Sequence, residues 1–100
     1  MSGLAGRVAL VTGGSRGVGR AIARRLAADG AAVAVNYRRD DAAARETVAA
    51  IEADDGKAVA YQAAIGDDQA VPAMTEAVRA DLGEVDILVS NAGTASRAGR

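Results

Sequence analysis

The segment between residues 12 and 19 has the composition of a loop that binds phosphate groups. It has the sequence Thr-Gly-Gly-Ser-Arg-Gly-Val-Gly, and it lies between the apolar run at residues 8–11 and a helical pattern. Glycine allows a positive φ and lets a ligand approach without meeting a Cβ atom. The N–H groups and the dipole at a helix start then stabilise negative charge. This order of strand, glycine-rich turn and helix predicts a site for a diphosphate.

The residues that follow the glycine loop exclude two other kinds of phosphate-binding site. The pattern is Gly-x-x-x-Gly-x-Gly rather than Gly-x-Gly-x-x-Gly. A P-loop would continue with Gly-Lys-Ser or Gly-Lys-Thr, but Gly19 is followed by Arg20 and Ala21. A methyltransferase or flavin site would have an acidic residue at the end of the second strand, and none is present there. In the absence of a ligand, the same glycines would form only a tight turn.

The end of the second predicted strand is basic. In NAD-binding units, an Asp or Glu about twenty residues past the loop binds the ribose 2′-hydroxyl. Here Tyr37 occupies that position, followed by Arg38 and Arg39. A carboxylate would repel a 2′-phosphate, whereas an arginine pairs with it. Arg16 can approach the same phosphate from the other side, with the Ser15 hydroxyl beside it. We therefore predict NADP rather than NAD, and interpret Arg39 as a solvated charge.

Four short apolar runs alternate with three helical patterns. The predicted strands are 7–11, 32–36, 57–62 and 86–90. The predicted helices are 18–28, a second one capped by Asp40 or Asp41, and a third one starting at Asp67 or Asp68, with Pro72 in its first turn. This alternation predicts an α/β fold built from βαβ units, in which right-handed crossovers place helices on both faces of a parallel sheet.

Apolar residues at helical spacing predict which helix faces contact the sheet. They are Val18, Ile22 and Leu26 in the first helix, Ala44, Val48 and Ile51 in the second, and Val71, Met74, Val78 and Leu82 in the third. Gly30, Gly56 and Gly83 end the three helices, and at Gly30 we expect a left-handed backbone conformation.

Composition excludes several classes of function. The chain has 100 residues, which is one domain at most, and its net charge is −1. It contains no Cys and no His, so disulfides and thiolate chemistry are excluded, and we expect neither a metal site nor histidine-based acid–base catalysis. Basic and acidic residues are interspersed, so we expect no nucleic-acid or membrane partner. Without a leader or a long apolar run, we expect a cytoplasmic protein.

A third motif follows the fourth predicted strand. The sequence Asn91-Ala92-Gly93 is ordinary turn chemistry by itself. Combined with the glycine loop and the basic end of the second strand, it resembles the short-chain dehydrogenase/reductase family. The run at residues 35–38, Val-Asn-Tyr-Arg, is most similar to 3-oxoacyl acyl-carrier-protein reductases and NADP-dependent polyol or sugar dehydrogenases. Ser90 stands where the family usually has a second Asn.

The resemblance implies a Rossmann-type, doubly wound parallel sheet in the order 3-2-1-4, and a set of NADP contacts. Thr12 would connect the glycine loop to the fourth strand. The family commonly has an Asp that binds the adenine amino group, but Ala64 stands there, which leaves the N–H group of Ile65 to meet the ring. The implied contacts are Gly13, Ser15, Arg16, Gly17, Val18 and Gly19 at the pyrophosphate and adenosine ribose, Tyr37 and Arg38 at the 2′-phosphate, and Asn91, Ala92 and Gly93 along the ribose and the middle of the cofactor.

The residues that perform chemistry in this family have no counterpart here. They are a Ser, a Tyr-x-x-x-Lys pair and a further Asn, whereas Tyr61 is followed by Gln-Ala-Ala-Ile and is interpreted as a core residue. We therefore expect residues 1–100 to be the N-terminal part of a single NADP-binding Rossmann domain, without catalytic residues and without turnover of its own. Residues 87–89 are expected on an exposed sheet edge, where a strand of another chain can pair with them and lead to aggregation.

The implied activity is an NADP-dependent oxidoreduction of a small ketone or secondary alcohol, with homo-oligomers expected only for a full-length protein. One alternative is a catalytically silent NADP-binding module or redox sensor. Another is a structural α/β domain without a ligand. The presence of Ser and Tyr-x-x-x-Lys after Arg100 would distinguish the oxidoreductase from the catalytically silent module.

Overall fold

The computed structural model describes residues 3–13, 17–64 and 70–91. The elements are β1 (Val8–Thr12), α1 (Gly17–Ala28), β2 (Ala32–Tyr37), α2 (Asp41–Ala53), β3 (Lys57–Gln62), α3 (Ala70–Asp81) and β4 (Ile87–Ser90). The four strands begin and end within one residue of the predicted positions. The predicted start of the third helix, at Asp67 or Asp68, lies outside the described residues.

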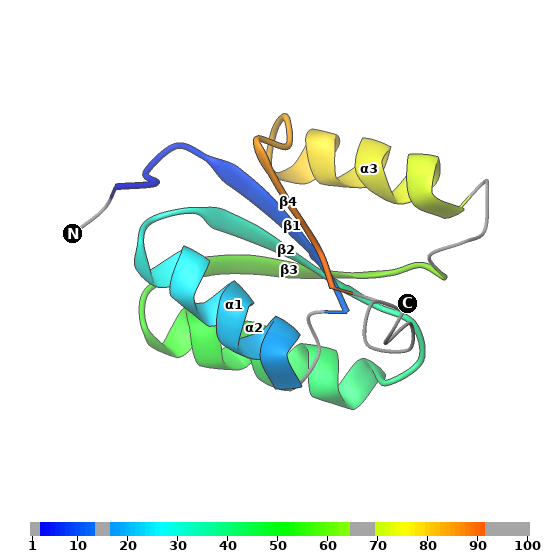
Figure 1. Cartoon of the computed structure of the whole chain (residues 1–100), viewed down its shortest axis with the longest axis horizontal. Helices are drawn as coiled ribbons and strands as arrows, with labels where there is room; N and C mark the ends of the chain where they lie inside the picture. The colour runs from blue at the N-terminus through cyan, green and yellow to red at the C-terminus, as the bar shows by residue number, and fades with distance from the viewer. Residues whose placement is uncertain (1–2, 14–16, 65–69, 92–100) are drawn as a thin grey trace, which may run out of the picture.

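The four strands form one parallel sheet in the order β3-β2-β1-β4. In the centre of the sheet, Leu10 of β1 lies opposite Ala34 of β2 on one side and Leu88 of β4 on the other. Helices α1 and α2 cover one face of the sheet and α3 covers the other (Figure 1). Both the doubly wound α/β fold and the strand order implied by the family resemblance are therefore confirmed.

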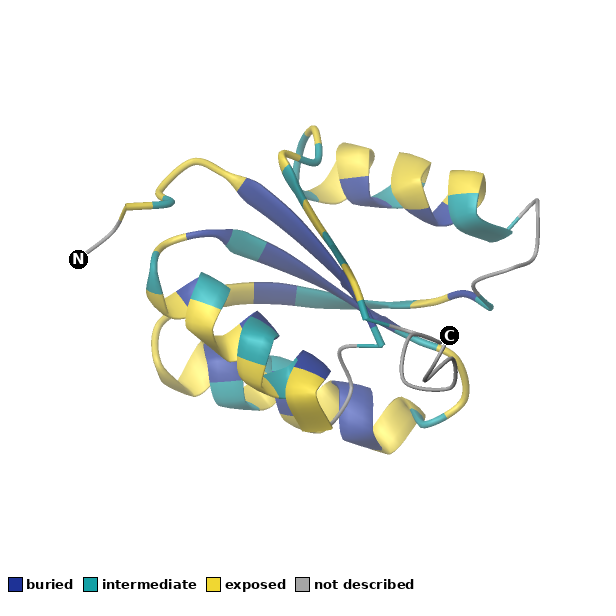
Figure 2. Ribbon diagram, in the orientation of Figure 1, coloured by how far each residue is buried: buried dark blue, intermediate teal, exposed yellow. Residues whose placement is uncertain are grey.

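The sheet buries both faces of its central strands. Figure 2 shows β1 as a continuous dark-blue strand between helices whose outer surfaces are exposed. A strand covered on both faces needs apolar residues at every position, which is why β1 and β2 are continuous apolar runs. One core, beneath α1 and α2, includes Ala9, Val11, Ala23, Val33, Val35 and Ile51, and the other, beneath α3, includes Val8, Leu10, Ala34, Met74 and Val78.

The buried face of α1 differs from the prediction. Its buried residues are Gly19, Ala23 and Ala27, whereas Val18 is 68% exposed. Ile22 is only partly buried at the border of this face. This face consists of small residues, and at Gly19 the helix backbone lies directly against Gly13 and Asn91. A prediction based on large apolar side chains selected the neighbouring stripe, and for Val18 it was wrong.

Helix α2 starts as predicted and is joined to α1 by a buried hydroxyl. Asp40 is the N-cap, and its Oδ1 accepts a hydrogen bond from the N–H of Ala43 at 2.9 Å. Thr47, which is fully buried, accepts a hydrogen bond from Nε of Arg20 at 2.9 Å. Arg20 also donates to the carbonyl of Ala43 at 3.1 Å. The first turns of α1 are thereby fixed against α2.

The helix ends contain the expected glycine and one unexpected residue. Gly30 has a φ of +108°, which confirms its predicted left-handed conformation. After α2 the left-handed residue is Asp55, with a φ of 67°, rather than Gly56.

Tyr61 on β3 is only partly buried and donates to Oδ2 of Asp81 at 2.8 Å, so that it joins β3 to α3. Desolvation and this hydrogen bond raise the pKa of Tyr61 above its ordinary value.

Strand β4 forms an edge of the sheet as the structure describes it. It pairs with β1, and Leu88 is 63% exposed, while Ile87 and Val89 are partly buried. An apolar strand edge of this kind is a template for pairing with another chain, and a lysine on the edge blocks such pairing.

Replacing Leu88 by lysine is expected to reduce self-association of the chain without lowering its melting temperature, because the side chain is largely solvated already. Static light scattering over a range of protein concentrations measures the effect. Val59→Lys, on the opposite edge strand β3, is the comparison that shows whether the effect belongs to β4. Unchanged scattering by the Leu88 variant would show that β4 does not mediate association.

Candidate functional site

The carboxyl ends of β1, β2 and β4 meet at one edge of the sheet. From β1 the chain continues through α1 to β2, which pairs with one edge of β1, whereas β4 pairs with the other edge of β1. The strand order therefore reverses between β1 and β4. In open α/β sheets, ligands bind outside the carboxyl ends of the strands at such a reversal. The glycine loop begins at this point, directly after Thr12.

Thr12 connects β1 to the end of β4. Its Oγ1 donates to the carbonyl of Val89 at 3.3 Å and accepts a hydrogen bond from the N–H of Asn91 at 2.8 Å. Thr12 is buried. This is the structural connection between the glycine loop and the fourth strand that the family resemblance implied.

Gly13, Gly19 and Asn91 contact one another. Gly13 has a φ of +66°, and its carbonyl accepts a hydrogen bond from Nδ2 of Asn91 at 3.3 Å. Gly19 lies directly against this pair. A Cβ atom at Gly19 would overlap the carbonyl oxygen of Gly13 and lie 2.9 Å from Nδ2 of Asn91. Glycine is therefore required at position 19 because the first turn of α1 packs on the loop and on β4.

The opposite side of the α1 N-terminus is open. A Cβ atom at Gly17 would have no neighbour within 4 Å, and Val18 exposes most of its surface. The first turn of α1 contains no acidic residue. An anion at this helix start would therefore meet N–H groups and a favourable dipole without a competing carboxylate from that turn.

The end of β2 combines two exposed arginines with a tyrosine that is held in place. The hydroxyl of Tyr37 donates to Oδ1 of Asp41 at 2.8 Å, and Oδ2 of Asp41 is 2.8 Å from Nε of Arg45. The hydrogen bond to Asp41 raises the pKa of Tyr37 above its ordinary value. Among residues 3–13, 17–64 and 70–91, no carboxylate forms an ion pair with Arg38 or Arg39.

Sequence reasoning did not select Asn36, which connects the strand ends. Its side chain is 1% exposed, and Oδ1 accepts a hydrogen bond from the N–H of Gly13 at 3.2 Å. Its Nδ2 donates to the carbonyl of Ala63 at 3.1 Å. The available signal was an amide residue at the end of the apolar run 32–35, since a buried polar side chain needs a partner.

The structure describes seven of the twelve predicted contact residues. Gly13, Gly19 and Asn91 are brought together. Gly17 and Val18 lie on the open side of the first turn of α1, Tyr37 ends β2, and Arg38 follows it. Ala64, at the position where the family has an acidic residue, is partly buried after β3. The remaining predicted residues, Ser15, Arg16, Ile65, Ala92 and Gly93, lie outside the described residues.

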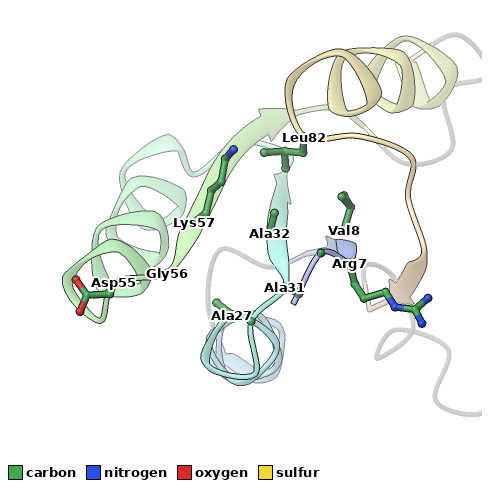
Figure 3. Close-up of a pocket in the computed structure, with 11 residues that line it drawn as sticks. Arg7, Val8, Ala27, Ala31, Ala32, Asp55, Gly56, Lys57 and Leu82 are labelled. Carbon is green, nitrogen blue, oxygen red and sulfur yellow. The ribbon is translucent and has the colours of Figure 1, made fainter. Parts of the chain in front are cut away.

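A pocket of about 250 Å³ lies at the opposite edge of the sheet, where the strands begin. Figure 3 shows Arg7 at the start of β1 pointing away from Lys57 at the start of β3, with Leu82 beside the pocket. Its charged groups do not converge, so we do not assign it as the site. In the described part of the chain, no acidic side chains gather as metal ligands, and no helix is long and apolar enough to cross a bilayer.

A family model for short-chain dehydrogenases matches residues 7–99. The chain belongs to this family. The match spans both the glycine loop and the Asn91-Ala92-Gly93 motif. Members of the short-chain dehydrogenase family are oxidoreductases, and the order of strands around the glycine loop is that of their nucleotide-binding sheet.

Two curated members of the family and one solved structure illustrate the similarity. A 3-oxoacyl acyl-carrier-protein reductase of Synechocystis is 43% identical over 93 residues, covering 93% of this chain and 38% of the reductase. A short-chain dehydrogenase/reductase homolog of Bacillus subtilis is 46% identical over 86 residues, covering 86% of this chain and 79% of that protein. A Burkholderia cenocepacia short-chain dehydrogenase in complex with NADP has a TM-score of 0.86 at 52% identity, covering 91% of this chain and 37% of that one.

The chain spans between 34% and 38% of the length of several curated family members. The aligned part is the sheet and the strand ends described above.

Proposed function

We propose that this chain is the NADP-binding part of a short-chain oxidoreductase that interconverts a small ketone and a secondary alcohol. The observation that carries the proposal is Arg38, an exposed cation without a carboxylate partner among the described residues, at the end of β2. NAD-binding units place a carboxylate at this end of the second strand. An arginine there favours a 2′-phosphate instead.

The donor groups of this edge fit NADP. Gly17 leaves open space beside the start of α1, where a pyrophosphate would meet N–H groups. The two carboxylates that follow Arg38 in sequence are both engaged elsewhere. Asp40 accepts a hydrogen bond from the N–H of Ala43, and Asp41 binds Tyr37 and Arg45. The residues proposed to hold the cofactor are Gly13, Ser15, Arg16, Gly17, Val18, Gly19, Tyr37, Arg38, Ile65, Asn91, Ala92 and Gly93.

The role of this chain in the reaction is to bind and orient. The bound nucleotide would supply a hydride as NADPH or accept one as NADP⁺. Proton transfer to the substrate oxygen requires the Ser and the Tyr-x-x-x-Lys pair of the family, and residues 1–100 contain no Tyr-x-x-x-Lys sequence. We therefore propose no catalytic residue in this chain, and expect binding of the nucleotide without turnover of a carbonyl substrate.

A second candidate is a catalytically silent nucleotide-binding module. The Bacillus subtilis homolog supports this candidate, because the part it shares with this chain makes up most of its length. The two candidates differ in what the protein contains besides this segment. A protein that has the segment together with Ser and Tyr-x-x-x-Lys reduces carbonyl substrates, whereas a module only binds the nucleotide.

The proposal predicts that the folded chain binds NADPH more tightly than NADH, by about tenfold or more, because charge-assisted hydrogen bonds to a phosphate contribute roughly 1.5–3 kcal/mol. Isothermal titration calorimetry of the chain with each nucleotide measures the two dissociation constants. Circular dichroism of the same sample establishes that it is folded. A folded chain that binds neither nucleotide, or binds NADH equally well, contradicts the proposal.

A further inference from the structure

We propose that Asn36 is a positioning residue that fixes the glycine loop in its nucleotide-binding conformation. The proposal rests on the proposed function, because it concerns the same site. Asn36 is not among the residues expected to touch the cofactor. It acts through Gly13, to which it is hydrogen-bonded.

The buried position of Asn36 means that its amide must be hydrogen-bonded within the protein. It is the penultimate residue of β2, and its side chain is 1% exposed between the loops that follow β1 and β3. A buried amide that lacks partners is unfavourable, whereas a fully bonded one specifies a single arrangement of its neighbours. The described residues contain no buried side-chain nitrogen or oxygen atom without a partner, so the Asn36 amide is satisfied.

The partners of Asn36 fix the direction of its amide. On one side, Oδ1 accepts from the N–H of Gly13 at 3.2 Å. On the other, Nδ2 faces the carbonyls of Ala63 at 3.1 Å and Tyr61 at 3.4 Å, and Sδ of Met74 at 3.4 Å. A donor is required toward these acceptors and an acceptor toward Gly13. The single side chain therefore connects the start of the glycine loop to the end of β3.

Gly13 is held from both neighbouring strands. Asn36, on β2, binds its N–H group, and Asn91, after β4, binds its carbonyl. Gly13 has a left-handed φ of +66°, a conformation that glycine adopts freely and that its own residue type does not fix. The two asparagines supply the restraint. A loop that is ordered before the ligand arrives binds it more tightly, because less conformational entropy is lost on binding.

The test compares Asn36→Leu with Val33→Ala in the full 100-residue chain. Leucine has a similar size but leaves the Gly13 N–H and the Ala63 carbonyl without their partner. Val33 is fully buried in the same strand, so Val33→Ala lowers stability without touching the loop. We expect about tenfold weaker binding of both NADPH and NADH by the Asn36 variant, with their ratio unchanged, and a change of less than twofold for the Val33 variant.

Amide hydrogen exchange followed by NMR supplies a readout that is independent of the nucleotide. In the wild-type chain the N–H of Gly13 is expected to be protected, and in Asn36→Leu its protection is expected to be lost while that of central β2 amides remains. If the leucine variant does not fold, Asn36→Ala removes the same bonds without adding apolar volume, and the same results are expected.

Three outcomes overturn the proposal in distinguishable ways. Loss of Gly13 protection with unchanged affinity shows that Asn36 has only a structural role. Weakened binding by the Val33 variant to the same extent assigns the effect to general stability. Failure of the wild-type chain to bind either nucleotide overturns the proposed function, and this proposal with it, whatever the exchange of Gly13 shows.

Discussion

Replacing Gly19 by alanine is expected to abolish detectable nucleotide binding and to lower the free energy of unfolding by about 1–3 kcal/mol, the usual cost of overpacking. The added Cβ would overlap the carbonyl oxygen of Gly13 and press on Nδ2 of Asn91. Neither neighbour can move freely. The first is a backbone atom, and Nδ2 of Asn91 donates to the Gly13 carbonyl while the backbone N–H of Asn91 donates to Thr12. The first turn of α1 must therefore shift away from the loop. Calorimetric titration and thermal unfolding measure the two effects.

Two other glycines serve as controls for Gly19→Ala. Alanine at Gly17 meets no atom within 4 Å but must adopt a φ near +64°, at a cost of roughly 1–2 kcal/mol, so an intermediate loss of stability is expected. Alanine at Gly3 meets neither obstacle, and we expect no effect. Equal effects at positions 19 and 3 would show that close packing of α1 on the loop is not what requires glycine.

Replacing Arg38 by alanine is expected to weaken NADPH binding by about 10- to 100-fold and to leave NADH binding within twofold. This range corresponds to losing charge-assisted hydrogen bonds to one phosphate, roughly 1.5–3 kcal/mol. The selectivity arises because NADH has no 2′-phosphate for the guanidinium to bind. Titrations of the variant with both nucleotides give the ratio directly. The exposed side chain of Arg38 makes no ion pair among the described residues, so the fold should be unaffected.

The neighbouring arginine is a matched control for this experiment. Arg39 has the same charge and is also exposed, and the sequence predicts that it is a solvated charge. We expect Arg39→Ala to change NADPH affinity by less than threefold, the effect of a more distant charge in water. If the Arg39 variant loses NADPH preference and the Arg38 variant does not, the assignment of the 2′-phosphate contact is wrong by one position.

Most of the fold could be predicted because the residues that begin and end its helices and strands act locally. The strand β3 was predicted at Lys57–Gln62 and observed there, since a polar boundary and a glycine flank its apolar run. The left-handed Gly30 followed from helix-ending chemistry. The buried face of α1 could not be predicted from apolar size alone, because it consists of Gly19, Ala23 and Ala27, and Gly19 is buried by close approach of the backbone to Gly13 rather than by hydrophobicity. The tertiary contact overrides the periodic signal there.

The candidate site was predictable in its glycines and not in its supporting contacts. Gly13 and Gly19 carry a recognisable spacing, and the structure shows that they touch. The hydrogen bonds of Asn36 join positions that are 23 and 27 residues apart in sequence, so they depend on the order of strands in the sheet. Thr47 is buried by α1, and its partner Arg20 reaches it only once both helices are packed. Such contacts require the fold to be known first.

The contact between Thr12 and Asn91 joins residues 79 positions apart, through a four-residue strand at the edge of the sheet. A short, partly exposed edge strand opens at a lower free energy than the whole domain. When β4 opens, Asn91 would leave both the Thr12 hydroxyl and the Gly13 carbonyl, so Gly13 in the proposed nucleotide site would lose one of its two restraints in the same event. A ligand that binds only the closed arrangement thereby also stabilises the pairing of β4 with β1. In this chain, we therefore expect the opening of β4 and the occupancy of the proposed nucleotide site to be one coupled equilibrium.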